Sequence, residues 1–421
     1  MRGRMDEAKQ ELSQPKQTLW RGPFRLWATG SLISAAGDQF FLVALPWLIL
    51  EHTSSAGVLG GVMTAAAIPR AVLMLLGGAV TDRFSPRRIM MITATCRALL
   101  VGALAALVGV GWLHLWQLYA LCFCFGTADA FAAPASQAFL PVLVEKEQLT
   151  AANSVMESLT QGMTLVAPAP AGWLIKGFGV LWAFVVDAVS FVAILIALVR
   201  LPDAGSLKGP SSTEAAGPAT RKESTMLGSI LKGLQAVQAD RPLFAFLVLV
   251  AVLNFCIEGP LLIGLALLAK NNFHSSTSYG VLMSTMAVGS LVGMALAGLW
   301  RLPHLGYGLL AICVLIGITL GAMGLLGSMT GLVVDILVMM VGSGYINVQL
   351  MAWFQKRVER EVMGRVMSVL MFAVVGLMPF SMALAGVLGG WSLHGMFLIA
   401  GAMVVLTTVL SGLSRDVRAI A

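Results

Sequence analysis

The sequence contains few charged residues. Asp, Glu, Lys and Arg make up 11% of its 421 residues, whereas a typical globular protein has about 25%. A soluble protein of this length needs a polar surface around its apolar core, and this composition does not supply one. An ordinary soluble domain is therefore excluded.

Several features of enzymes and secreted proteins are also missing. The five cysteines lie within apolar stretches, without the spacing of a metal site or a disulfide framework. No phosphate-binding loop of the form Gly-x-x-x-x-Gly-Lys-Ser/Thr occurs, so nucleotide hydrolysis is not predicted. The polar residues 1–21 have no apolar signal-peptide core behind them, and we expect a cytosolic tail there. We expect no enzyme activity, no metal and no cofactor.

Apolar residues dominate the chain instead, at 58% of the sequence. A helix needs about 20 apolar residues to cross a bilayer. Windows of that size give twelve candidate spans, at 23–50, 56–80, 89–112, 116–140, 151–175, 180–201, 242–269, 277–300, 305–327, 330–354, 364–390 and 393–413. The sequence therefore predicts an all-α membrane protein with twelve transmembrane helices.

The order of the spans divides the chain into two halves of six spans each, 22–201 and 242–414. Between them, 202–241 begins with a stretch rich in Gly, Pro and Ser, which predicts a flexible cytosolic linker. Leucine, isoleucine and valine then recur at helical spacing, which predicts a short amphipathic helix on the inner membrane face. We expect residues 415–421 to form a second cytosolic tail.

Basic residues are distributed unevenly between the two sides of the membrane. With the N-terminus inside, the inner segments hold 22 Lys and Arg, and the outer loops hold only Lys176 and Lys270. This asymmetry predicts a multi-pass protein of the inner membrane with both termini in the cytoplasm. It also explains the net charge of +7 without nucleic-acid binding.

The connection between the second and third spans carries a charge cluster at the inner surface. The chain reads GGAVTDRFSPRRIMM over 77–91. Gly78 allows close approach of two helices, and Asp82 lies where the span meets water. Three arginines complete the cluster: Arg83, Arg87 and Arg88. We expect it to latch one half against the other; the alternative is a simple stop-transfer signal.

This loop resembles the major facilitator superfamily signature Gly-x-x-x-Asp-Arg-x-Gly-Arg-Arg, although Ser85 replaces the second glycine. Further segments are similar to the branch of macrolide-efflux proteins and the enterobactin exporter: 35–50, 134–154, 240–255 and 353–369. The resemblance covers nearly the whole chain. It implies the two-bundle fold, a small-molecule substrate and a monomer.

The fifth span carries Ala-Pro-Ala-Pro-Ala-Gly at 167–172. This is a partial match to the Gly-Pro-x-x-Gly-Gly motif of proton-coupled drug antiporters in that superfamily, and it favours export. Its two prolines predict a bend in the helix.

Ionisable residues at membrane depth are costly and usually functional. Asp38, with Gln39 beside it, lies in the first span and Arg70 in the second. We expect Asp38 and Arg70 to form an ion pair, either for proton coupling or for helix packing.

Glu258 follows Asn254 by one turn in the seventh span, so both lie on one face. We expect Glu258 to bind a cationic group or carry a proton; the alternative is a protonated acid hydrogen-bonded between helices.

Other polar residues within the spans are weaker candidates. Gln161 is predicted to face a central cavity, and of Asn347 and Gln349 only one can do so; we select Asn347. Structural roles are expected for three charged residues, Asp129, Asp187 and Arg97. Arg97 is interpreted as the counterpart of Asp187.

These features predict a secondary active exporter of small amphiphilic molecules of drug, macrolide or siderophore type. We expect proton-coupled antiport by alternating access, driven by the proton gradient. The expected partners are the substrate, protons and the lipids of the membrane. The main alternative is a lipid or lysophospholipid transporter of the same fold. A nutrient importer and a membrane sensor are further alternatives.

Overall fold

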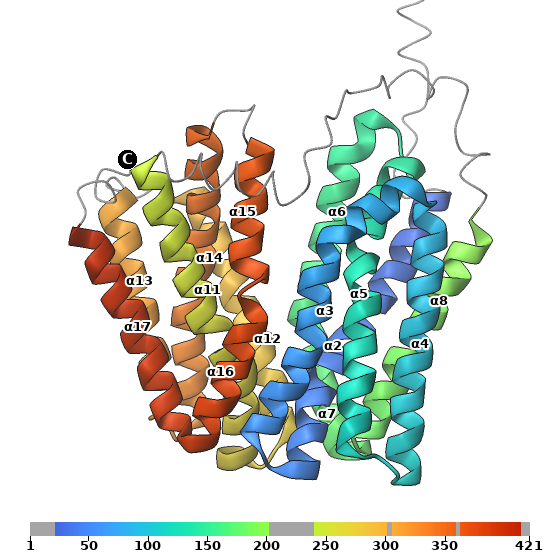
Figure 1. The fold of residues 1–421 in the computed structure, drawn as a ribbon, viewed down its shortest axis with the longest axis horizontal. Coiled ribbons are helices and arrows are strands. Elements are labelled where there is room, and N and C mark those ends of the chain that lie inside the picture. The colour runs from blue at the N-terminus through green and yellow to red at the C-terminus, as the bar shows by residue number, and fades with distance from the viewer. Residues whose placement is uncertain (1–21, 202–239, 301–304, 359–362, 414–421) are drawn as a thin grey trace, which may run out of the picture.

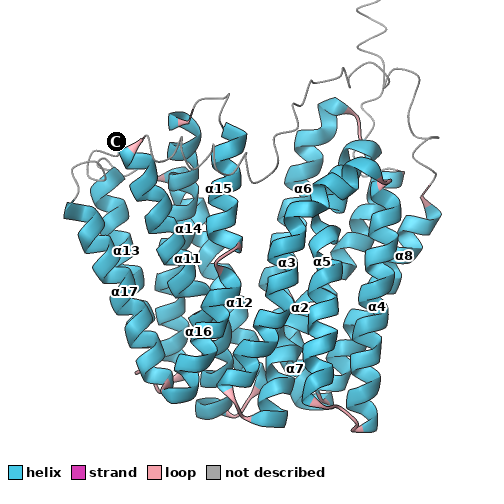
Figure 2. Ribbon diagram, in the orientation of Figure 1, coloured by secondary structure: helices cyan, strands magenta, loops and turns pink. Residues whose placement is uncertain are grey.

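The computed structural model describes residues 22–201, 240–300, 305–358 and 363–413 (Figure 1). These ranges are helical and contain no strand, and Figure 2 shows that short loops join the helices. The predicted tails, the linker and its amphipathic helix lie outside the described residues. Within these ranges some residues are described by their backbone alone, among them 75–83, which include Gly78, Asp82 and Arg83.

The first six spans form one group of helices in Figure 1. They comprise α2 (Pro23–Thr53), α3 (Ala56–Arg83), α4 (Pro86–Val110), α5 (Leu115–Leu143), α6 (Leu149–Val166), α7 (Pro168–Phe178) and α8 (Val180–Arg200), with a short 3-10 turn at Lys146–Gln148. Pro23 and Pro86 stand at the first positions of α2 and α4, where a helix needs no backbone N–H.

The remaining spans form the second group. They comprise α11 (Arg241–Leu268), the π-helical turn η2 (Ala269–Phe273), α12 (Ser276–Leu299), α13 (Leu305–Met323), α14 (Met329–Arg357), α15 (Met363–Val375), α16 (Met378–Trp391) and α17 (Leu393–Leu413). Asp240 caps α11, since its Oδ1 accepts from the Leu243 amide at 3.3 Å. Asp240 also binds Arg357 of α14, with Nε and Oδ2 2.8 Å apart.

The predicted all-helical membrane fold is confirmed. In the part of the chain that the structure describes, 11 helices are long and apolar enough to cross a membrane. The predicted fifth span is the exception, because it breaks at Ala167 into α6 and α7. Pro168 begins α7 and has no N–H to continue the ladder of α6, so the predicted bend is present. The predicted eleventh span is interrupted between α15 and α16, but Val369–Trp391 still forms one apolar span.

In the part of the chain that the structure describes, the two groups meet at one end, which we name the closed end (Figure 1). There Gly60 of α3 packs on Gly386 of α16, so closely that a Cβ on Gly60 would lie 2.6 Å from the Gly386 Cα. Thr64 Oγ1 donates to the Pro379 carbonyl at 3.2 Å, and Ser276 Oγ of α12 donates to the Gly172 carbonyl of α7 at 2.9 Å. The first residues of α2 and the last of α17 lie at the opposite end (Figure 1).

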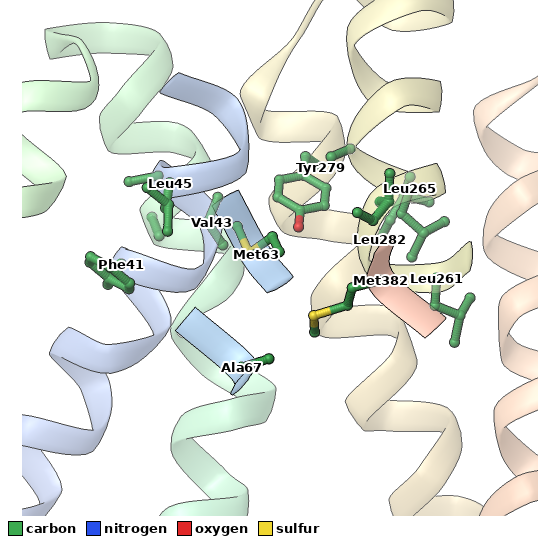
Figure 3. Packing of buried hydrophobic residues seen from close by; sticks show 14 of the residues in the cluster. Phe41, Val43, Leu45, Met63, Ala67, Leu261, Leu265, Tyr279, Leu282 and Met382 are labelled. Atoms are coloured by element: carbon green, nitrogen blue, oxygen red, sulfur yellow. The ribbon is translucent and has the colours of Figure 1, made fainter. Parts of the chain in front are cut away.

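Buried side chains fill the closed end. Figure 3 shows Met63 of α3, Met382 of α16 and Tyr279 of α12 among them. Tyr279 is completely buried, and its hydroxyl has no hydrogen-bond partner among the described residues. A further contact joins the groups here, since the Lys270 ammonium lies 5.1 Å from the centre of the Trp47 ring. Trp47 Nε1 donates to Glu51 Oε1 at 2.9 Å.

Candidate functional site

Four charged side chains from four consecutive helices meet within the first group. Arg97 of α4 lies between two acids: its Nη2 is 2.5 Å from Asp38 Oδ1 and 3.5 Å from Asp129 Oδ1. Arg70 Nε lies 3.2 Å from the other oxygen of Asp129. We name Asp38, Arg70, Arg97 and Asp129 the N-terminal charge network. Two arginines balance its two carboxylates, as burial at membrane depth requires.

Aromatic rings hold the central arginine of the network in place. The Arg97 guanidinium carbon lies 4.3 Å from the centre of the Phe191 ring and 5.0 Å from that of Phe125. Phe125 in turn stacks on Phe41 at 4.5 Å. A guanidinium packs favourably on ring faces because its charge is delocalised and weakly hydrated. Arg97 is therefore held by side chains from α2, α5 and α8.

The network differs from the predicted ion pair. We expected Asp38 to pair with Arg70, but Asp38 pairs with Arg97 and Arg70 pairs with Asp129. The physical reason is the helix packing: α3 packs along α5, which brings Arg70 to Asp129, and α2 and α4 both pack along α8, beside which Arg97 reaches Asp38. Access also differs, since the side chain of Arg70 is 53% exposed and that of Arg97 only 11%.

Asp187 of α8 lies beside this network and is completely buried. Ser190 Oγ donates to the Asp187 backbone carbonyl at 2.7 Å and lies 3.4 Å from its Oδ1. Asp187 Oδ2 is buried with no hydrogen-bond partner in the described structure, and the same holds for Arg97 Nε. The predicted pairing of Arg97 with Asp187 is therefore not formed; Arg97 pairs with Asp38 instead.

A second candidate site lies within the other group of helices. A cavity of 370 Å³ is lined from α11, α13, α14 and α15. Asn254, Glu258 and Asn347 share it with Met351 and Met371, so three residues selected from the sequence meet in one place. Its walls combine apolar and methionine side chains with a few polar groups, as small-molecule sites commonly do.

Glu258 is the acid of this cavity. It is exposed, and among the described residues it forms no ion pair or hydrogen bond. The Asn254 amide, one turn earlier, donates to the Val250 carbonyl at 2.9 Å, which leaves its oxygen available. A carboxylate without a protein counter-ion at this depth needs a proton or a cation from outside the chain.

The remaining predicted residues lie away from these two sites or have local partners. Gln161 Nε2 donates to Glu157 Oε1 at 3.0 Å on an exposed face of α6. Gln349 Nε2 binds the Ala297 carbonyl at 3.0 Å and so joins α14 to α12, which leaves Asn347 as the cavity residue. Gln39 is half-buried on α2, next to Asp38.

The predicted latch loop is described only in part. Arg87 donates from Nε to the Leu198 carbonyl at 3.0 Å and from Nη2 to the Val199 carbonyl at 3.2 Å. These bonds satisfy carbonyls at the last turn of α8, within the same half. Arg88 is exposed. The latch role stays a prediction.

Sequence reasoning missed Asp335 of α14 altogether. Its Oδ2 is buried without a hydrogen-bond partner among the described residues. The sequence also predicted a purely structural role for Arg97 and Asp129, although Arg97 holds the network together. The sequence did contain a signal for Asp335, Arg97 and Asp129. Each is an ionisable residue inside an otherwise apolar span, and every such residue is a candidate for a functional site.

Comparison with known sequences identifies one family. The profile described as the Major Facilitator Superfamily matches residues 27–380. The chain is similar to "Macrolide efflux protein A" of Streptococcus pyogenes, at 24% identity over 413 residues, 96% of this chain and 98% of that protein. It is also similar to "Multidrug efflux pump Tap" of Mycobacterium tuberculosis, at 26% identity over 413 residues and 92% of each chain.

Solved structures give the same fold. The nucleoside transporter NupG superposes with a TM-score of 0.73 at 13% identity, over 93% of this chain and 99% of that one. A bacterial homologue of the iron transporter ferroportin in the inward-facing state gives 0.67 at 18% identity, over 94% and 98%. At this identity the likeness concerns the fold alone.

Proposed function

Because this chain belongs to the Major Facilitator Superfamily, we propose that it exports drug-like amphiphilic molecules across the inner membrane in exchange for protons. The family makes it a multi-pass membrane transporter and not an enzyme. Its two sequence relatives named above are efflux proteins, of macrolides and of multiple drugs. Drugs are therefore favoured as substrates over lipids, the alternative considered from the sequence.

The observation that carries this proposal is Glu258 in its cavity. An acid without a partner beside amide groups and flexible apolar side chains suits a molecule that joins a cationic amine to a large apolar body. Macrolides with an amino sugar have this chemistry. The lone carboxylate attracts the amine, while methionines adapt to the rest.

Proton coupling is proposed from the N-terminal charge network. The Asp38 side chain is 34% exposed although it lies at membrane depth, so it can exchange a proton while Arg97 balances its charge. Substrate recognition in the second group and proton exchange in the first would then be separate tasks. Alternating access would couple them through the contact between the groups.

The orientation of this conformation is part of the proposal. With both termini in the cytoplasm, the closed end faces outward and the conformation is open to the inside. Exposed tryptophans support this placement, since they lie near the helix ends at the closed end, as in an interfacial belt. They are Trp112, Trp116, Trp173, Trp182 and Trp391. One copy contains both sites, so we propose that a monomer suffices.

Transport by purified protein in liposomes tests the function. Radiolabelled erythromycin would be supplied on the side of the membrane that carries the termini. Transport would be measured without a proton gradient and with a higher proton concentration on the opposite, closed-end side. We expect movement toward the closed-end side that rises with the gradient. Movement that ignores the gradient would refute proton coupling, and phospholipid as the only transported species would support the alternative.

The variant Glu258→Gln, with Asp335→Asn as the matched control, tests the site. Both variants remove one acid from a span of the second group, but only Glu258 lines the cavity. We expect Glu258→Gln to lose erythromycin transport and Asp335→Asn to keep it. Equal transport by both variants would refute the assignment of the site.

A further inference from the structure

Two buried polar atoms near the N-terminal charge network have no partner in the described structure: Arg97 Nε and Asp187 Oδ2. Arg97 Nε–H is a donor and Asp187 Oδ2 is an acceptor, so the two atoms could bond to each other, but in this conformation they do not. Leaving a buried donor and acceptor unpaired is costly, and such pairs point to a second arrangement of the same side chains.

The two groups are close enough for that arrangement. Phe191 follows Asp187 by one turn on α8, and the Arg97 guanidinium carbon lies 4.3 Å from its ring. Asp187 therefore lies on the helix face that Arg97 already contacts. Gly37 places the α2 backbone directly on the same spot, because a Cβ there would lie 2.8 Å from Asp187 Oδ1 and 2.1 Å from Ser190 Oγ. Asp38 is the next residue along α2.

Among the described residues, only two charged groups of the surrounding helices act on Asp187. It interacts electrostatically with Asp38 on α2 and Arg97 on α4. Arg70 and Asp129, on α3 and α5, balance each other within the network. The only charged residue of α7, Lys176, lies in its last turn. Three acids thus share two arginines, which leaves one carboxyl group to be neutralised by a proton.

The carboxyl group that lacks an arginine partner in this conformation is that of Asp187. It is completely buried and has no ion pair with any described residue, whereas Asp38 and Asp129 both bind arginine. An ionised carboxylate in such a place would lack both water and a counter-ion. A protonated Asp187 needs neither.

We propose that Arg97 is a two-position switch, which pairs with Asp38 in this conformation and with Asp187 in another. When Arg97 turns its Nε–H to Asp187, that acid becomes the carboxylate and its proton passes to Asp38. One O–H bond breaks at Asp187 and one forms at Asp38, and the total charge stays constant. Asp187 thus stores the proton away from water, and Asp38 presents it to the open side.

This inference rests on the proposed proton-coupled export. It adds that Asp187 is the residue that holds the proton before Asp38 releases it. Asp187 and Arg97 are positioning residues, because neither touches the substrate cavity of the second group. In an exporter open to the inside, arrival of the drug would favour the second position of Arg97. The stored proton would then leave through Asp38.

The variant Asp187→Asn tests the switch. Asparagine has nearly the shape of a protonated aspartic acid, but it cannot become a partner of Arg97 by losing a proton. With erythromycin as the probe, we expect wild-type protein in weakly buffered detergent to release protons on binding, and the variant to release none. In liposomes the variant should keep erythromycin–erythromycin exchange and lose accumulation driven by the proton gradient.

A purely structural Asp187 predicts the opposite result, since a permanently neutral acid would tolerate asparagine. Proton release and gradient-driven accumulation at wild-type levels in Asp187→Asn would therefore overturn the switch. Wild-type protein that transports erythromycin without any proton effect would instead refute the proposed coupling, and the inference with it. The two failures are thus distinguishable.

If the Asp187→Asn variant does not fold, a measurement on the wild-type protein still tests the switch. Infrared difference spectroscopy on erythromycin binding should show loss of the carbonyl band of a buried protonated aspartic acid. The band should be absent from Asp187→Asn where that variant folds. A wild-type spectrum without any change in protonated carboxyl bands would also overturn the switch.

Discussion

The unpaired hydroxyl of Tyr279 makes a quantitative prediction about the closed end. The residue is completely buried where the two groups of helices meet, and its hydroxyl has no hydrogen-bond partner in the described structure (Figure 3). Separation of the groups at this end would expose it to water. The hydroxyl therefore destabilises the closed conformation relative to the open one.

The variant Tyr279→Phe removes that hydroxyl and keeps the ring. A buried polar group without a partner costs about 1–3 kcal/mol, which corresponds to roughly 5–150-fold in a conformational equilibrium. We therefore expect Tyr279→Phe to increase the closed-to-open ratio by a factor in this range. Turnover should fall as well, because the transporter then leaves the closed conformation less often.

Distance measurement by electron spin resonance checks this prediction. Spin labels at Trp116→Cys on α5 and Trp391→Cys on α16 would report the separation of the two groups, because both tryptophans are exposed near the closed end. The native cysteines would first be replaced. Tyr307→Phe is the matched control, since Tyr307 is 57% exposed and its hydroxyl can reach water. An unchanged or more open distribution in Tyr279→Phe would refute the reasoning.

Three further predictions concern the same contacts. Glu258→Gln should weaken erythromycin binding by about 1.5–3 kcal/mol, the worth of a charged hydrogen bond, without affecting an uncharged substrate; titration calorimetry with both ligands checks this. Lys270→Met removes the contact with Trp47 and should favour the open form by about 0.5–1 kcal/mol, and an unchanged distance distribution would contradict this. Gly386→Leu cannot pack on Gly60, so it should keep the spin labels apart and abolish transport, whereas Gly298→Leu on α12, where a Cβ would meet nothing within 4 Å, should do neither.

The spans could be predicted from the sequence because their physical requirement is local. In lipid, every backbone group must be satisfied within its own helix, so each crossing leaves a long apolar window. The same local logic placed Asn254 and Glu258 on one face, and both line the cavity. It also indicated the bend at Pro168, where the fifth span breaks.

The partners of the charged residues could not be predicted in this way. The expected pair of Asp38 and Arg70 assumed that consecutive helices pack together, yet α2 packs along α8 and α3 along α5. Which helix lies beside which is set by side-chain packing over the whole bundle, and no short window contains it. Arg97 could be recognised as a costly charge in an apolar span, but its place between two acids could not.

The two candidate sites are connected through the helices that carry them. Asp38 and Trp47 lie on the same helix, α2, and Glu258 lies on α11, which leads directly into the η2 turn that carries Lys270. Because Lys270 contacts the ring of Trp47, these two helices touch at the closed end while their acids lie farther along toward the open end. A shift of α2 that follows the exchange of the Asp38 partner would therefore act on α11 at this contact. Lys270 lies in the π-helical turn Ala269–Phe273, so this contact is made by an irregular turn of the kind that often marks a functional site.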